Sequence, residues 1–354
     1  MSALLNFRFQ LSISFFTLRS SQVTTEPPTI IQTDPSLTRS LTSVAESDRL
    51  EEDSAVWARL RELRARSAVY DAEHTIPAES KVHLEMMIFK ENENFKAAFK
   101  AHIVLQGGDY SFQGYVVISD HRLYATKEQV IGREGDVLWS TPLDQLQRIT
   151  VQLGGQAVLI ETREKASEGI WSMPGRPGSP LKWILAYIGD AGWCDQFTQI
   201  LNGCTAESVR NIRSEVAYSD VLASLHMEND PLRVYSQGYW CILDDGGVVP
   251  VEKTYASIVI TSQDIVVVRE RHVEPEKVKF TEVCAHSITA VSSLALEEDD
   301  PRIANVTFAL DETANREQVW YFETASFASM YAFIEGLRQP WQDIFDVELP
   351  LSYI

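Results

Sequence analysis

An internal repeat constrains the fold of this chain more than any other feature of its sequence. The segment VVISDHRLYATKE, Val116–Glu128, aligns without gaps on IVITSQDIVVVRE, Ile258–Glu270. Shorter matches follow in the same order: Arg148–Thr150 with Ser287–Thr289, Leu185–Ile188 with Val319–Phe322, and Trp193, Phe197 and Ile200 with Phe327, Tyr331 and Ile334. One such match is weak evidence. Several in one order predict a duplicated module of about a hundred residues, an ordinary domain size.

Each copy has the same predicted order of elements. Short runs rich in β-branched and aromatic residues, separated by glycine-rich turns, indicate antiparallel strands. In the first copy they begin with KVHLEMMIFK, Lys81–Lys90, and end in a helix over Asp190–Gly203. In the second copy the closing helix starts at Ser326 and is expected to stop at Pro340. The sequence therefore predicts a mainly β protein with a module at 80–204 and another at 231–339.

Short strands closed by one C-terminal amphipathic helix resemble the pleckstrin-homology-like fold. The resemblance implies two partly open barrels, each plugged by its helix. The family's helix often carries an inward tryptophan, a place that Trp193 matches and Phe327 takes in the second copy. The block LEMMIFKENENFKAAFKAHIV, Leu84–Val104, is also similar to the C-terminal regions of nischarin and the related serine/threonine-kinase-interacting scaffold proteins. Leucine-rich repeats precede that region in those proteins, and no such repeat occurs in this sequence.

The segments before the first module are expected to carry less structure. Residues 1–45 are rich in Ser, Thr and Pro, which predicts a disordered leader. Its first residues resemble a targeting segment only faintly, because Arg8 interrupts the apolar run. Residues 46–79 are read as a helix and linker. Trp57 and Leu60 lie on or beside its narrow apolar stripe, so this helix is expected to dock on a neighbour.

Two more segments follow the modules. Between them, 205–230 is read as a packed linker helix, because Val209, Ile212 and Val216 have helical spacing. After the second module, 340–354 is an acidic and aromatic tail. Its apolar side chains either form a docking peptide for a partner or fold back on the second module; these candidate partner-binding residues are Trp341, Ile344, Phe345 and Leu349.

Charge and cysteine usage exclude several classes of protein. The formal net charge is −19, which argues against a nucleic-acid partner, since phosphate contacts need a basic face. The four cysteines form no C-x-x-C pair, so free thiols in a reducing compartment are expected. No run approaches the roughly 20 apolar residues of a spanning helix, so membrane contact would be peripheral.

Ser119, Asp120 and His121 stand side by side as the components of a hydrolytic triad would. Consecutive strand residues face opposite ways, however, and triad members meet from distant parts of a chain. In the second copy Thr, Ser and Gln replace them, which predicts a hairpin corner in both copies. We therefore expect a protein that is not an enzyme and has no catalytic residue. A hidden enzyme would need polar groups that converge only in three dimensions.

No pattern of metal or cofactor ligands stands out. The seven histidines are scattered, without H-x-x-x-H spacing. Cys284 and His286 alternate along one strand, where buried packing is the expected role. The acidic loops LDDGG and LEEDDP lack EF-hand spacing. We expect no cofactor and no metal.

Phosphoinositide binding is the activity that the pleckstrin-homology resemblance raises first. The family's lipid-binding form has a lysine late in strand 1 and a basic K/R-x-R early in strand 2. The corresponding loops, LQGGDYSFQGY and LDDGGVVPVEKTY, do not match and carry acids. Lys96, Lys100 and Lys253 remain as candidate weak lipid contacts.

Protein binding is the leading interpretation. A barrel of this kind is expected to offer an exposed strand edge beside the helix for a partner's strand. The sequence thus predicts an intracellular signalling scaffold or adaptor for protein partners, such as a protein kinase or a trafficking component. It would be cytoplasmic, with peripheral contact to endosomal or lysosomal membranes. The alternative is a membrane-recruitment module with an atypical lipid or phosphoinositide site.

Overall fold

The computed structural model describes residues 57–62, 76–106, 110–130, 136–163, 182–205, 210–214, 216–243, 253–274, 277–311 and 316–354. Residues Arg49–Ile354 form one compact unit. The predicted leader at 1–45 lies outside the described residues, as does most of the helix and linker predicted at 46–79. Residues 57–62 of that segment are helical. Trp57 and Leu60 pack into the core of the second module, so the predicted docking of this helix is seen.

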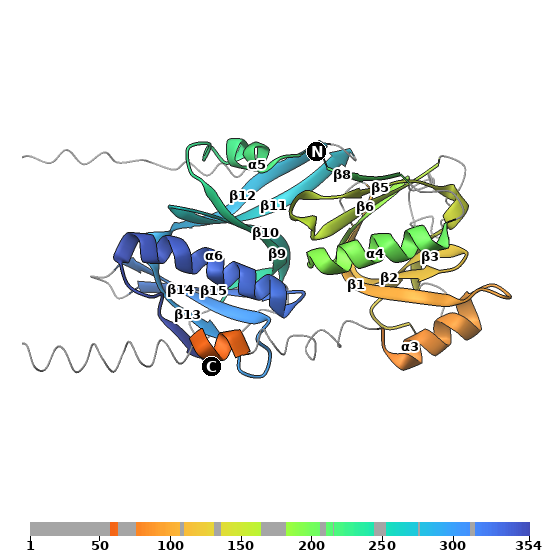
Figure 1. The fold of residues 1–354 in the computed structure, drawn as a ribbon, viewed down its shortest axis with the longest axis horizontal. Coiled ribbons are helices and arrows are strands. Elements are labelled where there is room, and N and C mark those ends of the chain that lie inside the picture. The colour runs from red at the N-terminus through yellow and green to blue at the C-terminus, as the bar shows by residue number, and fades with distance from the viewer. Residues whose placement is uncertain are drawn as a thin grey trace, which may run out of the picture. The chain divides into compact units, whose positions relative to one another are not determined.

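The first module is built on one eight-stranded sheet with the strand order β4-β3-β2-β1-β7-β6-β5-β8 (Figure 1). Its strands are β1 (Phe95–Leu105), β2 (Ser111–Ser119), β3 (Arg122–Lys127), β4 (Val137–Pro142), β5 (Leu146–Val151), β6 (Ala157–Thr162), β7 (Trp183–Tyr187) and β8 (Arg210–Arg213). The helix α3 (Ala78–His83) and the π-helical turn η2 (Leu84–Ile88) precede β1, and α4 (Ala191–Cys204) follows β7.

The second module repeats this arrangement in the order β12-β11-β10-β9-β15-β14-β13-β16 (Figure 1). Its strands are β9 (Leu232–Ile242), β10 (Thr254–Thr261), β11 (Asp264–Glu274), β12 (Lys277–Ser287), β13 (Val291–Leu296), β14 (Ile303–Asp311), β15 (Arg316–Thr324) and β16 (Leu351–Tyr353). The helix α5 (Tyr218–Ser224) precedes β9, and α6 (Phe327–Phe345) follows β15.

The two sheets share their pairing directions as well as their order. The last strand of each pairs in parallel, β8 with β5 and β16 with β13, whereas the other pairings among the described strands are antiparallel. In the described residues neither sheet closes on itself. The predicted fold of two partly open barrels, each with a closing helix, is confirmed.

The closing helices fix how the two copies correspond. The Asp190 side chain accepts a hydrogen bond from the Trp193 backbone N–H at 3.0 Å and caps α4. Ser326 caps α6 in the same way through Ser329, also at 3.0 Å. With the caps aligned, the core-facing triplet Cys194, Phe197 and Leu201 of α4 corresponds to Met330, Phe333 and Leu337 of α6.

This register corrects three of the matches drawn from the sequence. The predicted helix pairing of Trp193 with Phe327 is off by two residues, and Trp193 is only half-buried. The pairing of Leu185–Ile188 with Val319–Phe322 has the same slip, because Tyr187 lies opposite His102 whereas Glu323 lies opposite the equivalent Tyr239. A slip of two keeps the face of a strand, so the hydrophobic pattern cannot detect it.

The third correction concerns Ser287–Thr289, which was paired with Arg148–Thr150 in β5. It belongs instead to the 3-10 turn Ile288–Ala290 before β13, whose counterpart is the turn Leu143–Gln145 before β5. Two short polar–Ile–Thr runs therefore match by composition and not by position.

Three predicted elements are also wrong. Lys81–Lys90, expected as a strand, contains the end of α3 and the turn η2. The predicted linker helix is a strand at Arg210–Arg213, with helix only at Tyr218–Ser224, and Val209 lies outside the described residues. The last helix does not stop at Pro340 but continues through it to Phe345.

The modules contact each other where the two helices begin. The Ser326 hydroxyl donates to the Asp190 carboxylate at 2.6 Å, so the two helix caps are hydrogen-bonded to each other. The Ser329 hydroxyl donates to the Gly189 carbonyl at 2.8 Å. Gly189 has φ +78°, and a Cβ there would lie 2.5 Å from the Ala325 side chain. Glycine is needed at this position to let the two helix starts approach.

Aromatic and polar side chains complete the junction. His102 of β1 stacks on Tyr255 with ring centroids 4.7 Å apart, and its Nδ1 lies 3.2 Å from the Tyr239 hydroxyl. Burial lowers the pKa of His102 to about 4. Nearby, Glu270 of β11, whose side chain is only 7% exposed, accepts a hydrogen bond from the Tyr187 hydroxyl of the first module at 3.3 Å. The junction is thus a packed, partly polar interface and not a loose linker.

Candidate binding groove

A hollow of about 440 Å³ lies in the first module between β1 and α4. We call it the β1–α4 groove. The six consecutive residues Phe95–Lys100 of β1 line one side, and Trp193, Gln196 and Ile200 of α4 line the other. Ile76 and Lys81, next to and in α3, complete the lining.

The strand side of the groove is a free backbone edge. Phe95–Val104 pair with β2 on one side, with a bulge between Phe95 and Ala97. On the other side β7 pairs only from His102 to Leu105. Among the described strands, nothing pairs with that edge of β1 before His102, and these are the residues that line the groove. Within the described residues, their outward backbone groups have no strand partner.

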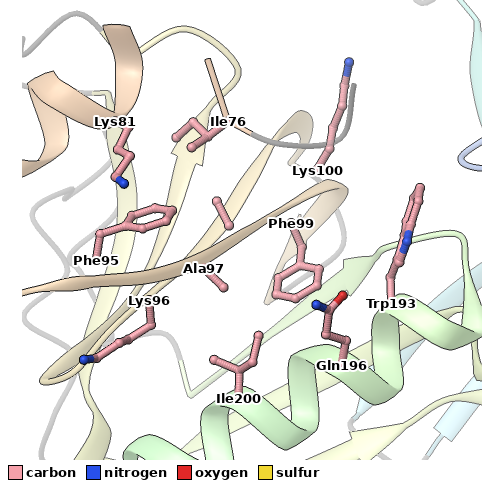
Figure 2. A pocket seen from close by; sticks show the side chains of 11 residues that line it. Ile76, Lys81, Phe95, Lys96, Ala97, Phe99, Lys100, Trp193, Gln196 and Ile200 are labelled. Atoms are coloured by element: carbon pink, nitrogen blue, oxygen red, sulfur yellow. The ribbon is translucent and has the colours of Figure 1, made fainter. Parts of the chain in front are cut away.

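The walls differ in chemistry on the two faces of β1. Ala97 and Phe99 face the module core and α4, and the Phe99 ring meets Phe197 edge-on at 5.6 Å. Ala98 and Phe95 face the opposite way, into a cluster with Ile76. Figure 2 shows Phe99, Gln196 and Ile200 on one side of the strand, with Lys81 and Lys100 on the other.

Three lysines give the groove a positive rim in an acidic protein. Lys81 lies 4.7 Å from the Phe95 ring centroid and 3.9 Å from Glu85, and Lys96 lies 3.9 Å from Asp120. Lys100 is closer to its partner, Glu128, at 2.7 Å. These side chains are partly exposed, and such surface ion pairs are weak. The lining itself contains no carboxylate, so the rim can attract an anionic ligand.

The same position in the second module is filled. The bulged strand pair places Ala97 opposite Ile118 and Val234 opposite Ile260, so Val234 is the counterpart of Ala97. The helix caps make Gly336 the counterpart of Ile200.

Gly336 brings the helix backbone directly onto the strand. A Cβ at this position would lie 1.9 Å from a Val234 methyl carbon. Across the same contact Arg233, the counterpart of Lys96, lies 3.5 Å from Asp343 of α6. The second module thus has a closed contact where the first has a groove.

The predicted hairpin corner is confirmed at Ser119. Its hydroxyl oxygen accepts from the backbone N–H groups of Arg122 at 2.8 Å and His121 at 3.2 Å. Thr261 makes the same two bonds, to Asp264 at 3.0 Å and Gln263 at 3.2 Å. The hydroxyls of both copies therefore close the same kind of turn.

Asp120 is also held by structural contacts. Its carboxylate accepts from the Asn94 backbone and side chain, both at 2.8 Å. These bonds hold the pKa of Asp120 well below its usual value, with a smaller contribution from His121.

The remaining candidate lipid contact, Lys253, is engaged within the second module. Its Nζ donates to Glu323 at 2.6 Å and to the Tyr321 hydroxyl at 2.9 Å. Lys96 and Lys100, by contrast, lie together at the β1–α4 groove. Residues 107–109 of the first predicted lipid loop and residues 244–252 of the second lie outside the described residues.

The C-terminal residues fold back on the second module. Trp341 and Leu349 are buried in its core cluster, whereas Ile344 and Phe345 remain partly exposed. Leu351–Tyr353 form β16 on the edge of β13. In the first module β8 occupies the corresponding edge of β5. The sequence predicted an open strand edge beside the helix without indicating which strand provides it. The edge that is open in the first module belongs to β1.

The cysteines form no disulfide among the residues that the structure describes. Cys194, Cys204, Cys241 and Cys284 are free thiols, and burial raises the pKa of Cys194. His286 Nε2 lies 2.5 Å from the Gln318 side-chain oxygen and its ring packs on Phe308. No group of three or more metal-ligating side chains is found in the described ranges. None of the described helices is long and apolar enough to cross a membrane.

Sequence families match both modules. Residues 67–174 match the PLEKHM2 PH domain-like family, and residues 255–353 match the C-terminal PH domain of STK11-interacting protein. The chain therefore carries tandem pleckstrin-homology-like domains and resembles STK11-interacting proteins. The second match runs through β16, so the strand that follows α6 lies within the domain.

Solved structures give more distant similarities. The DH/PH fragment of PDZRHOGEF, solved with human RhoA, is 9% identical over 43% of this chain and 44% of that chain, with a TM-score of 0.28. The hSac2 domain from human phosphoinositide phosphatase Sac2 is 14% identical over 39% of this chain and 89% of that chain, with a TM-score of 0.23. The chain spans less than half the length of the DH/PH structures that it matches. No curated protein sequence matches the chain.

Proposed function

We propose that this chain is a non-enzymatic adaptor that binds protein partners through its tandem modules. The observation that carries the proposal is the open β1–α4 groove in one of two otherwise matching modules. A free strand edge beside a helix is a common way to hold a partner's segment. The packed junction supports a scaffold role, because it would present both modules in one arrangement.

The partner class rests on the match of residues 255–353 to the C-terminal PH domain of STK11-interacting protein. Signalling and trafficking proteins, including protein kinases, are the partners that we propose, in the cytoplasm or at endosomal or lysosomal membranes. Ile344 and Phe345 are a second proposed contact, since both remain partly exposed at the end of α6. Trp341 and Leu349 would support that surface from beneath and not touch the partner.

A membrane-recruitment role is the second candidate. The observation that favours it is the cluster of Lys81, Lys96 and Lys100 at one groove. Several lysines at one site can neutralise the charges of an anionic lipid headgroup.

An interaction screen with the full chain distinguishes the two functions. Bait proteins would be wild type, the groove variant Lys100→Glu, the helix-end variant Ile344→Ser/Phe345→Ser, and Lys279→Glu as a charge-matched control on the exposed strand β12. The adaptor function predicts direct binding to a purified partner that one of the first two variants weakens and the control does not.

Vesicle sedimentation tests the alternative. The probe is phosphatidylcholine vesicles containing phosphatidylserine and mixed phosphoinositides. Binding to these vesicles, lost in Lys100→Glu, with no partner bound by any form of the chain, would replace the adaptor function with membrane recruitment.

A further inference from the structure

We infer that the β1–α4 groove binds an extended peptide segment of a partner protein as an added strand on β1, with apolar and acidic side chains in alternation. This inference rests on the proposed adaptor function and adds the ligand chemistry of the site. It depends on three properties of the groove: its free edge, its two faces and its charge.

The free edge sets the form and length of the ligand. Phe95–Lys100 line the groove along consecutive positions, so the backbone itself forms the wall. An added strand would take the place on β1 that β7 takes from His102 onward. Strands rise about 3.3 Å per residue, so an edge of this extent accommodates a segment of about six residues.

The two faces of β1 set the alternation. Successive side chains of a strand point to opposite faces. One face of an added strand would lie against the apolar side chains of Phe99, Trp193 and Ile200, on the side where Gln196 and Lys96 also lie (Figure 2). The other would lie toward Lys81 and Lys100, which project to the opposite side (Figure 2). A segment that alternates apolar and acidic residues would place its apolar side chains on the first face and its acidic side chains beside Lys81 and Lys100.

The charge favours this ligand over its alternatives. The chain has a net charge of −19, yet the groove lining contains three lysines and no carboxylate. A basic peptide would meet like charge at the rim, and a wholly acidic one would leave the apolar wall unused. The partners Glu85 and Glu128 lie outside the lining and can be exchanged for an incoming carboxylate.

Selection of peptides on the full-length chain tests the inference. Random twelve-residue peptides displayed on phage would be selected on wild-type protein, and the enriched sequences synthesised with a fluorescent label. We expect enriched peptides with alternating apolar and acidic residues. Their affinity, measured by anisotropy, should fall about tenfold or more in Lys81→Glu/Lys100→Glu, because rim charges then repel the ligand.

The second module supplies the matched control. Arg233 is the counterpart of Lys96 but lies at the closed contact, beside Asp343. Arg233→Glu should leave peptide affinity unchanged, and circular dichroism would check that both variants remain folded. Equal loss in the Arg233→Glu control, or no loss in the lysine variant, overturns the inference.

Backbone N-methylation of the selected peptide tests strand addition itself. Alternate amides of an added strand face β1, so methylation at every second position should abolish binding and methylation between them should not. Uniform tolerance of N-methylation, or the failure of any peptide to be enriched, overturns the inference. If a purified partner binds the lysine variant as well as it binds the wild type, the adaptor function is retained but the inference about the groove is not. Vesicle binding that the lysine variant abolishes, with no peptide enriched, assigns the groove to lipid.

Discussion

The two modules share a strand order, a hairpin corner and a helix cap, yet they differ at one contact between strand and helix. In the first module Ala97 and Ile200 leave a groove; in the second Val234 and Gly336 close it. The larger side chain stands on the helix in one module and on the strand in the other. A duplicated fold can therefore keep its topology while small exchanges in side-chain size change which surface is open.

The junction between the modules shows a second asymmetry, at Glu270 and its counterpart Glu128. The side chain of Glu270 is almost fully buried and accepts hydrogen bonds from Tyr187, Gln237, Tyr235 and Ser257. Burial by itself would raise the pKa of Glu270, but the neighbouring His272, 3.8 Å away, and the hydrogen bonds from Ser257 and Tyr235 hold it below its usual value. Glu128 is exposed and pairs only weakly with Lys100.

The largest predicted effect comes from removing this buried carboxylate. Glu270→Ala should lower the free energy of unfolding by about 3–5 kcal/mol, because several buried donors lose their acceptor. Glu128→Ala should lower the free energy of unfolding by less than about 1 kcal/mol, because exposed ion pairs contribute little stability. Urea denaturation of both variants measures the difference, and similar losses would show that the junction does not depend on Glu270.

Gly336→Ala tests the closed contact of the second module. In an unhindered helix this change stabilises by about 1 kcal/mol. The new Cβ would meet a Val234 methyl carbon at 1.9 Å, so we expect a loss of about 1–3 kcal/mol instead.

Val234→Ala is the partner change in a double-mutant cycle. It removes the 1.9 Å contact but leaves the one at 2.8 Å to Cβ, so the rescue should be partial. Thermal unfolding of the wild type, the two single variants and the double variant gives the coupling free energy between Val234 and Gly336. A stabilising Gly336→Ala in the wild-type background would contradict the closed contact.

A smaller effect is expected from acid at the junction. The folded pKa of His102 is about 4, below the ordinary 6.5, because the ring is buried among Tyr187, Tyr239 and Tyr255. Between pH 6.5 and about pH 4, the unfolded chain therefore binds more protons than the folded chain. The stabilisation present at neutral pH is lost as the pH falls through that window.

We expect about 1–2 kcal/mol less stability from this group at pH 5 than at pH 7. Urea unfolding of wild type and His102→Gln at both pH values measures it, with the exposed His121→Gln as the matched control. Identical pH dependence in all three proteins would contradict burial of His102.

Much of the fold follows from local patterns in the sequence. The repeat at Val116–Glu128 and Ile258–Glu270 is a hairpin in both copies, and its polar corner was predicted because the second copy replaces Ser119 with Thr261. What could not be predicted depends on contacts between distant elements. The strands β8 and β16 are short and carry little pattern of their own, since their pairing with β5 and β13 defines them.

The wrong elements have specific physical causes. In Lys81–Lys90 a strand reading would place Leu84 and Met86 on one face, yet Leu84 is fully buried and Met86 is exposed, which fits helical spacing from Ser80. Pro340 removes only one helical hydrogen bond, to the carbonyl four residues earlier, and the helix continues past it with Pro340 buried.

The candidate groove was predicted only in part. Lys96 and Lys100 were identified as anion contacts, and Trp193 and Ile200 as an apolar helix face. The groove also needs the small side chain of Ala97 and the free edge of β1, which sequence spacing does not reveal.

Amide hydrogen exchange of the full chain tests the central contrast most directly. Amides at the open edge in Phe95–Lys100 should exchange faster than those in the counterpart segment Leu232–Gln237, where α6 covers the strand. A selected alternating peptide should slow exchange in Phe95–Lys100 and leave Leu232–Gln237 unchanged. Equal exchange in the two segments, with no change on adding peptide, would contradict the account.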